Sequence, residues 1–229
     1  MDSQKYSSDK SRAKKRQADV ARKLEKAIYE GQLSVCYQPE IDVTSFEIVT
    51  LEALCRWHDS DLNEVKPDEF IGIAEAHGLI VPLGEEVLRQ VLRDLPSLLK
   101  RWPGVRVAVN VSSLELAQKN FAEKTLAKIR LIDPNFCKSL EIEITESIYL
   151  LDFEIAQKNL STLQANSVTV ALDDFGTGHS NLLRLFTLPF DKVKLARSFV
   201  QELDAPMIQS LLKFIVEISH DFNKTLVIA

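Results

Sequence analysis

The sequence contains few cysteines and histidines, and none of them has the spacing of a metal site or redox motif. The cysteines are Cys36, Cys55 and Cys137, and the histidines are His58, His77, His179 and His220. No C-x-x-C pair occurs, and the number of thiols is odd. This pattern predicts cysteines that act as small buried side chains, and it indicates neither a disulfide nor a histidine-based metal centre.

The chain also has no apolar run that approaches the roughly 20 residues a membrane helix needs. Its amino terminus, MDSQKYSSDK, lacks the apolar segment of a signal peptide. With 229 residues, 45% of them hydrophobic and 27% charged, the chain can bury one sizeable core. We therefore expect a cytoplasmic globular protein without a membrane span.

The net charge of -5 is unevenly distributed. Residues 1–30 hold nine Lys or Arg against five acids, and the rest holds 19 basic against 28 acidic side chains. A basic arm can contact nucleic acid or a membrane surface. However, an apolar stripe at helical spacing (Val20, Leu24, Ala27 and Ile28) is typical of a solvated connecting helix. We favour the helix and expect no nucleic-acid partner.

Beyond residue 30, predicted strands and helices alternate. Strands are expected at residues 33–39, 46–57, 105–111, 140–145, 168–173, 191–196 and 225–229, and helices at 67–76, 84–100, 113–132, 153–164, 180–187 and 206–222. Alternation predicts either a parallel barrel or a doubly wound sheet. The first two strands are joined too closely for a crossover helix, so we expect them to be antiparallel neighbours.

One polar residue recurs on the same-parity face near the end of five strands. These residues are Glu52, Asn110, Glu143, Asp173 and Lys194. In a barrel they would converge on one mouth, whereas in an open sheet they would be spread along an edge. The recurrence favours the barrel.

The stretch VTVALDDFGTGHSN, from Val168 to Asn181, places two adjacent acids between a strand and a Gly-rich turn. Asp173 and Asp174 would repel each other unless a cation lay between them, although Asp and Gly are also common in ordinary turns. With the acids of the other strands they form an all-oxygen ligand set, which suits Mg or Mn. Two such ions can activate water and stabilise the leaving oxygen of a phosphodiester.

Two cationic residues extend this hypothesis. Lys194 would orient the attacking water or offset charge in the transition state, although lysine side chains commonly reach solvent instead. Arg56 lies on the face of Glu52, about 13 Å along the strand, and would bind a second phosphate in bidentate fashion. The chemistry indicated is metal-assisted hydrolysis of a substrate with more than one phosphate.

Each of these residues also has an ordinary structural interpretation. Glu52 would pair with Arg56 or a nearby lysine, and Asn110 would cap the helix that follows it. Glu143 and Glu146 would form a solvated edge. These alternatives are independent of one another, whereas a hydrolytic site explains all the residues together.

Seven motifs follow one another along the chain. They are YQPEID from Tyr37, LEALCRW from Leu51, PDEFIGIAEAHGLI from Pro67, VNVS from Val109, LEIEITES from Leu140, LDDFGTGHSNL from Leu172 and LPFDKVKLARSFV from Leu188. In this order they resemble the EAL domain family of cyclic di-GMP phosphodiesterases, from about Leu33 to the last residue. The resemblance implies an α/β fold, a modified TIM (β/α)8-type barrel with an antiparallel first strand, here incomplete with about seven strands and without the eighth.

The resemblance also implies an activity, which is hydrolysis of cyclic di-GMP to linear pGpG with two Mg or Mn ions in bacterial second-messenger signalling. It implies metal ligands at Glu52, Asn110, Glu143 and Asp173, with Asp174 serving the other metal and the nucleophilic water. It further implies a catalytic lysine at Lys194, a glutamate at Glu146 that holds the Gly-rich loop, and substrate contacts at Gln38 and Arg56.

Family members often carry a preceding GGDEF or sensory domain and dimerise beside the Gly-rich loop, here Phe175–Ser180. We therefore expect a basic connector helix at residues 1–30, an EAL domain at residues 31–229 that is incomplete at its carboxyl end, and a homodimer as one oligomeric state.

Two departures from the family pattern stand out. The family usually has Lys-Ile-Asp where this chain has Lys194, Leu195 and Ala196. Family members also continue after LVIA with EGVE, whose first Glu joins the metal site, and with an eighth strand. We therefore expect poor turnover and poor stability from this chain unless a partner covers the gap. The alternative function is a receptor or protein-interaction module that binds cyclic di-GMP without hydrolysing it.

Overall fold

The computed structural model describes residues 2–145, 153–176, 188–197, 201, 204–222 and 224–228. The chain forms two compact units. The first comprises Met1–Gln38 with Ala53–Asp94, and the second Pro39–Glu52 with Leu95–Ala229. The helix predicted at residues 180–187 lies outside the described residues.

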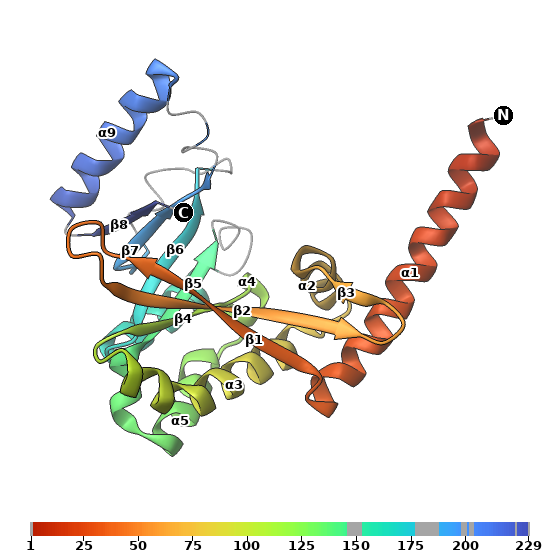
Figure 1. Ribbon diagram of the computed structural model, residues 1–229, viewed down its shortest axis with the longest axis horizontal. Helices are drawn as coiled ribbons and strands as arrows, with labels where there is room; N and C mark the ends of the chain where they lie inside the picture. The colour runs from red at the N-terminus through yellow and green to blue at the C-terminus, as the bar shows by residue number, and fades with distance from the viewer. Residues whose placement is uncertain are drawn as a thin grey trace. The chain divides into compact units, whose positions relative to one another are not determined.

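The strands form one sheet (Figure 1). They are β1 (Leu33–Ile41), β2 (Ile48–Asp59), β3 (Asn63–Val65), β4 (Arg106–Asn110), β5 (Leu140–Thr145), β6 (Thr169–Phe175), β7 (Lys192–Leu195) and β8 (Thr225–Ile228). Seven follow the order β1-β2-β4-β5-β6-β7-β8, and β3 pairs with β2 beside this path. Each neighbouring pair from β4 to β8 is parallel. β1 and β2 are neighbours joined by the short connection 42–47, which makes them antiparallel, as predicted.

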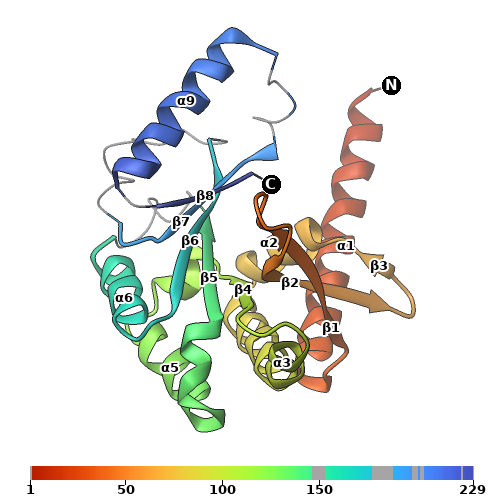
Figure 2. The same ribbon diagram turned by 60° about the vertical axis from the view of Figure 1, so that its left-hand side comes forward.

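Helices separate most of the parallel strands. The helical segments are α1 (Asp2–Glu30), α2 (Pro67–Ala76), α3 (Ile80–Arg101), α4 (Ser113–Leu116), α5 (Phe121–Ile132), the 3-10 helix η1 (Pro134–Ser139), α6 (Phe153–Ala165) and α9 (Pro206–Asp221). Figure 2 shows α5 and α6 along the same side of the parallel strands. The fold is therefore α/β, a modified and incomplete TIM-type barrel with seven strands in its main path, which confirms the predicted class. Within the described residues, no helix combines the length and apolar character needed to cross a membrane.

The first unit has its own apolar core, and the stripe predicted on α1 is part of it. The stripe residues Val20, Leu24, Ala27 and Ile28 are all buried there. Trp57 and Phe70 meet edge to face at the centre of this core, with ring centroids 6.0 Å apart. The carboxyl half of α1 is therefore a packed element, because its apolar face is covered.

In the second unit, the parallel strands are buried on both faces. β5 has five consecutive buried residues, Leu140 to Ile144, and all four residues of β7 are buried. One parity is apolar, as in Ile142 and Val193, while the other carries charged side chains. Because ionisable groups are rarely buried without partners, the charged side chains on this face of the strands must pair with other polar groups inside the unit.

The single helix predicted at residues 113–132 is instead divided into α4 and α5. The buried amide of Asn159 supports the break. Its Oδ1 accepts from the N–H of Ala122, and its Nδ2 donates to the carbonyl groups of Leu116 and Gln118. The ends of helices leave backbone N–H and C=O groups without partners in the helix. Where α4 ends and α5 begins, Asn159 on α6 supplies hydrogen bonds to three of these groups.

Three smaller predictions also differ from the structure. β1 continues through Pro39, which is tolerated because β1 ends the strand order and its missing N–H need not pair. α3 begins at Ile80, before Gly84. The prediction of buried cysteines is wrong for Cys36, which is exposed because alternation along β1 turns it outward, and Cys55 is only half-buried.

We predict that Asn159→Ala destabilises the protein by about 3 kcal/mol, because it leaves three backbone groups without their partner in a buried place. Urea unfolding followed by circular dichroism measures the change. Asn135→Ala, at an exposed asparagine of the same unit, is the matched control. Equal effects of the two substitutions would contradict the role assigned to Asn159.

Candidate metal centre

Polar side chains from neighbouring strands come together at the carboxyl end of the sheet in the second unit. The strand register pairs Asn110 of β4 with Glu143 of β5, and Thr145 of β5 with Asp173 of β6. Parallel strands end on one edge, which is where ligands bind in barrel enzymes. The predicted convergence of these strand ends on one rim is therefore observed.

Lys194 lies at the centre of this group. Its Nζ donates to Glu143 Oε1 at 2.7 Å and to Glu52 Oε2 at 3.0 Å, and it lies 3.8 Å from Asp173 Oδ1. Only 3% of the lysine side chain is exposed. The alternative in which Lys194 reaches solvent is therefore excluded.

Asn110 and Glu52 are also partners. Asn110 Nδ2 donates to Glu52 Oε1 at 2.9 Å. The cap of α4 is instead Ser112, whose side chain accepts from the N–H of Leu114 within a capping box with Glu115. Asn110 is therefore available to the rim and is not the cap of the helix that follows it.

An irregularity at the end of β6 affects the two adjacent acids. The register with β7 shifts between Leu172 and Phe175, and Asp174 adopts a φ of 54°, in the left-handed region. The N–H of Asp174 donates to Asp173 Oδ1 at 2.9 Å. A regular strand would send these side chains to opposite faces, and a bulge relaxes that alternation, so both acids can serve one rim.

A second layer of polar residues, two of them charged, lies two residues earlier on the same strands. We call Glu52, Glu143 and Lys194 the upper layer and Thr50, Glu141 and Lys192 the lower layer, since each strand contributes residues two positions apart. Lys192 Nζ lies 2.7 Å from Glu141 Oε1 and 3.2 Å from Thr50 Oγ1. Stacked layers from alternate strands are the usual filling of a TIM-type barrel.

Glu40 of β1 connects the two layers. Its Oε2 accepts from Lys192 Nζ at 2.9 Å, and its Oε1 lies 3.3 Å from Lys194 Nζ. Sequence reasoning missed Glu40, Glu141 and Lys192 as members of the cluster. The alternation of Lys192 with Lys194 and of Glu141 with Glu143 was the available signal, whereas Glu40 had none beyond its motif.

Burial governs the electrostatics of the cluster. It raises the pKa of Glu143 to about 8, against the opposing effect of Lys194, and it also raises the pKa of Asp173. Burial alone would lower the pKa of Lys194, but Glu143 and Asp173 outweigh it and raise that pKa above its ordinary value. The site therefore contains one ammonium group that stays protonated, and more carboxyl groups than this single positive charge can neutralise.

The donor set fits divalent cations. When ionised, the carboxylates at positions 40, 52, 141, 143, 173 and 174 outnumber the ammonium groups of Lys192 and Lys194. The ligand atoms of Glu40, Glu52 and Glu143 lie within 4.8 Å of one another. Glu143 Oε2 is buried without a hydrogen-bond partner among the described residues. An orphaned carboxylate oxygen in an all-oxygen, acidic site suits Mg or Mn.

The other predicted site residues are not part of this described cluster. Glu146 and the 177–180 portion of the Gly-rich loop lie outside the described residues. Gln38 and Arg56 belong to the first unit, where Gln38 is exposed and Arg56 Nη1 donates to the Cys55 carbonyl. Their assigned roles stay predictions.

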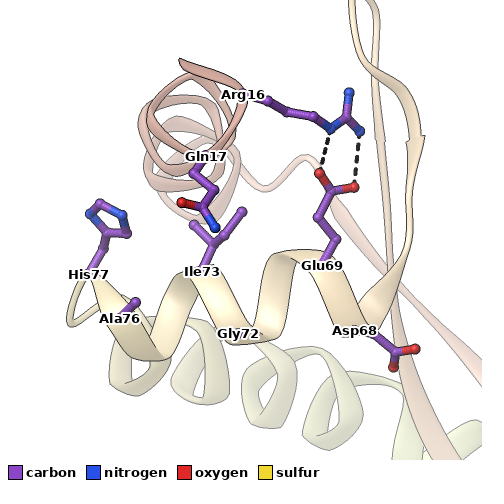
Figure 3. A pocket seen from close by; sticks show the side chains of 8 residues that line it. All are labelled: Arg16, Gln17, Asp68, Glu69, Gly72, Ile73, Ala76 and His77. Carbon is purple, nitrogen blue, oxygen red and sulfur yellow. Dashed lines mark hydrogen bonds and ion pairs between the residues drawn. The ribbon is translucent and has the colours of Figure 1, made fainter. Parts of the chain in front are cut away.

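The first unit has a surface groove of about 410 Å³ between α1 and α2 (Figure 3). Across it, Arg16 makes two hydrogen bonds to the carboxylate of Glu69, at 2.6 and 3.0 Å. Ile73 and His77 also line the groove. Because Arg16 and Glu69 already pair with each other, we assign this groove to the packing of α1 against α2 and not to a reaction.

The arrangement defines a class, namely barrel proteins with an acidic, lysine-containing rim at the carboxyl ends of their strands. Within that class, the EAL domain family matches residues 21–229. The chain belongs to the EAL domain family, as its motifs predicted.

Known proteins agree with this assignment. The chain is 35% identical over 201 residues to the cyclic di-GMP phosphodiesterase PdeR of Escherichia coli, covering 87% of this chain and 30% of that protein. It resembles a solved complex of the PaMucR phosphodiesterase with c-di-GMP, with a TM-score of 0.80 and 30% identity over 92% of this chain and 85% of that one. The EAL enzyme Bd1971 shares the fold, with a TM-score of 0.83 and 24% identity over 94% of this chain and 60% of that one. The chain spans 21–30% of the length of the first three curated relatives.

The raised pKa of Glu143 predicts a pH-dependent stability. Its folded pKa of about 8 exceeds an unfolded value of about 4.3, so the stability associated with this group is complete below pH 4.3 and is lost as the pH rises towards 8. In EDTA, Glu143→Gln should therefore gain stability relative to the wild type between pH 5 and pH 8.

Urea unfolding midpoints measured at both pH values test this prediction. Glu47→Gln, an exposed glutamate of the same unit, controls for the loss of a carboxylate. A constant difference between Glu143→Gln and the wild type across this pH range would show that Glu143 titrates normally in the folded protein.

Proposed function

We propose that this domain is a cyclic di-GMP phosphodiesterase, which hydrolyses one phosphodiester of its substrate to give linear pGpG. The observation that carries the proposal is the buried Lys194 ammonium group, held by Glu52 and Glu143 beside Asp173 at the carboxyl edge of the sheet. Membership of the EAL family and the naming of PdeR as a cyclic di-GMP phosphodiesterase support it.

The reaction consumes one water molecule. The water oxygen bonds to phosphorus, the bond from phosphorus to the 3′ oxygen breaks, and the leaving oxygen takes a proton. The product is the linear dinucleotide with a 5′ phosphate and a 3′ hydroxyl. Bound Mg or Mn ions would supply an activated water near neutral pH and compensate phosphate charge.

Residues of this chain would have two roles in the reaction, namely metal binding and stabilisation of charge. Glu52, Asn110, Glu143 and Asp173 would hold the metals, and Asp174 would serve the second metal and the attacking water. Lys194, cationic and withdrawn from solvent, would offset negative charge as it develops on the phosphate.

We propose that Glu146 holds the Gly-rich loop and that Gln38 and Arg56 contact the substrate. We further propose a cytoplasmic location, a homodimer through the loop after Asp174, and an upstream GGDEF or sensory domain. The division into a connector at residues 1–30 and an EAL domain at residues 31–229 also remains a proposal.

Metal-dependent product formation tests the function. Incubation with cyclic di-GMP and Mn²⁺ should yield linear product, separated by chromatography, and EDTA should abolish it. Glu52→Ala and Lys194→Ala should each lower the rate about 100-fold or more, since the first removes a proposed metal ligand and the second removes the cation proposed to offset charge on the reacting phosphate.

Glu47→Gln should retain the wild-type rate, because this side chain is exposed and outside the cluster. Circular dichroism must show that the two inactive variants are folded. Product formation that survives Glu52→Ala in a folded protein would remove the metal assignment.

A receptor that binds cyclic di-GMP without turnover is the second candidate, and Ala196 favours it. This residue stands where the family usually has an acid, and it is buried directly after β7, where its N–H donates to the Phe175 carbonyl. A methyl group in this position supplies no ligand and no negative charge.

The two candidates differ in the response to Ala196→Asp. A receptor binds cyclic di-GMP without forming product, and restoring the acid should then produce turnover, whereas Ala196→Asn, of the same size but uncharged, should not. If the wild type already makes product, the phosphodiesterase is supported. A binding titration beside the chromatographic assay provides both measurements.

A further inference from the structure

Glu40 faces two ammonium groups at once, one from each layer. Its Oε2 accepts a hydrogen bond from Lys192 Nζ. Its Oε1 is buried, lies 3.3 Å from Lys194 Nζ, and has no hydrogen-bond partner among the described residues. One oxygen of this carboxylate is thus hydrogen-bonded to Lys192, and the other forms an ion pair with Lys194 that does not have hydrogen-bond geometry.

The lower layer holds Glu40 firmly in place. Lys192 is 93% buried, and Glu141 and Thr50 occupy the positions around its ammonium group that Glu40 does not fill. A cation so deeply buried cannot exchange its carboxylate partners for water without a large cost. Glu40 is therefore anchored by Lys192, and its other oxygen lies beside Lys194 of the upper layer.

Lys194 differs from Lys192, because the carboxylates that accept its hydrogen bonds are also the proposed metal ligands. It donates to Glu52 and Glu143, and the next carboxylate, Asp173, is also a proposed ligand. When a divalent ion engages these oxygens, their capacity to accept from the lysine falls and the nearby positive charge repels the ammonium group. Among the carboxylates within 4 Å of Lys194 Nζ in the described residues, Glu40 is the one already tied to a second lysine.

We propose that Glu40 is a positioning residue, which takes over the Lys194 ammonium group and keeps it in the site when metal ions occupy the upper layer. This proposal rests on the proposed metal-dependent function. Lys192, through its contacts in the lower layer, supports Glu40 from below. The competing role is metal ligation by Glu40 itself, since its oxygen lies within 4.8 Å of ligand atoms of Glu52 and Glu143.

NMR detection of lysine ammonium groups tests the proposal without requiring turnover. The Lys194 signal, assigned by its absence in Lys194→Arg, should be present in the wild type both in EDTA and with saturating Mg²⁺. In Glu40→Gln it should persist in EDTA, where Glu52 and Glu143 still accept, and disappear with Mg²⁺. Glu47→Gln should behave like the wild type.

Persistence of the Lys194 signal in Mg²⁺-loaded Glu40→Gln, or its loss from the Mg²⁺-loaded wild type, overturns the proposal. Absence of any Mg²⁺-induced spectral change in the wild type overturns it as well, together with the proposed function.

Calorimetry and kinetics separate positioning from ligation. Glu40→Gln should bind Mg²⁺ within about threefold of the wild type, whereas loss of a metal ligand or of its direct support weakens binding by about tenfold or more. Its kcat should fall about tenfold or more while KM stays within about twofold, because the substrate is still bound but the cation is displaced.

A tenfold loss of Mg²⁺ affinity would make Glu40 a ligand and reject the positioning role, and an unchanged kcat would reject it too. If the wild type forms no product while the NMR signals change as expected, the proposed function fails and the role of Glu40 in holding Lys194 stands.

Discussion

The structure of the site depends on the burial of one ammonium group. Lys194 is removed from water, and an isolated ion in that position would be very unfavourable. Its charge is tolerated because carboxylates from β2 and β5 meet it at hydrogen-bonding distance. Burial also disfavours the ionised form of Glu143, so the lysine cation and this carboxylate require each other.

The need for paired charges also applies to the layer of side chains below the rim. The interior of a TIM-type barrel is usually filled by branched apolar side chains, whereas here Thr50, Glu141 and Lys192 form a polar layer beneath the rim. A buried ionic layer contributes little to stability compared with an apolar one of equal volume. What it contributes is a fixed position for each charge, which a metal site needs and an apolar layer could not provide.

The first unit follows a simpler principle. Its core is apolar, centred on Trp57 and Phe70, and the carboxyl half of α1 closes it. The Arg16–Glu69 pair crosses the groove above this core, where its exposed charges add little stability. The two units therefore differ in what they demand of the sequence. An apolar core tolerates many substitutions of similar volume, whereas in the charged site every ionised group needs a partner.

The sequence by itself determined the order of strands and helices, the apolar stripe of α1, and the recurrence of polar residues on one parity at strand ends. These are local properties, because periods of two and 3.6 residues follow from backbone geometry alone. Only the tertiary structure decided that Asn159 divides a predicted helix, that the bulge at Asp174 relaxes the alternation of two acids, and that Glu40 reaches both lysines. Those features depend on contacts between residues distant in sequence, and the pattern of a single segment carries no record of its partners.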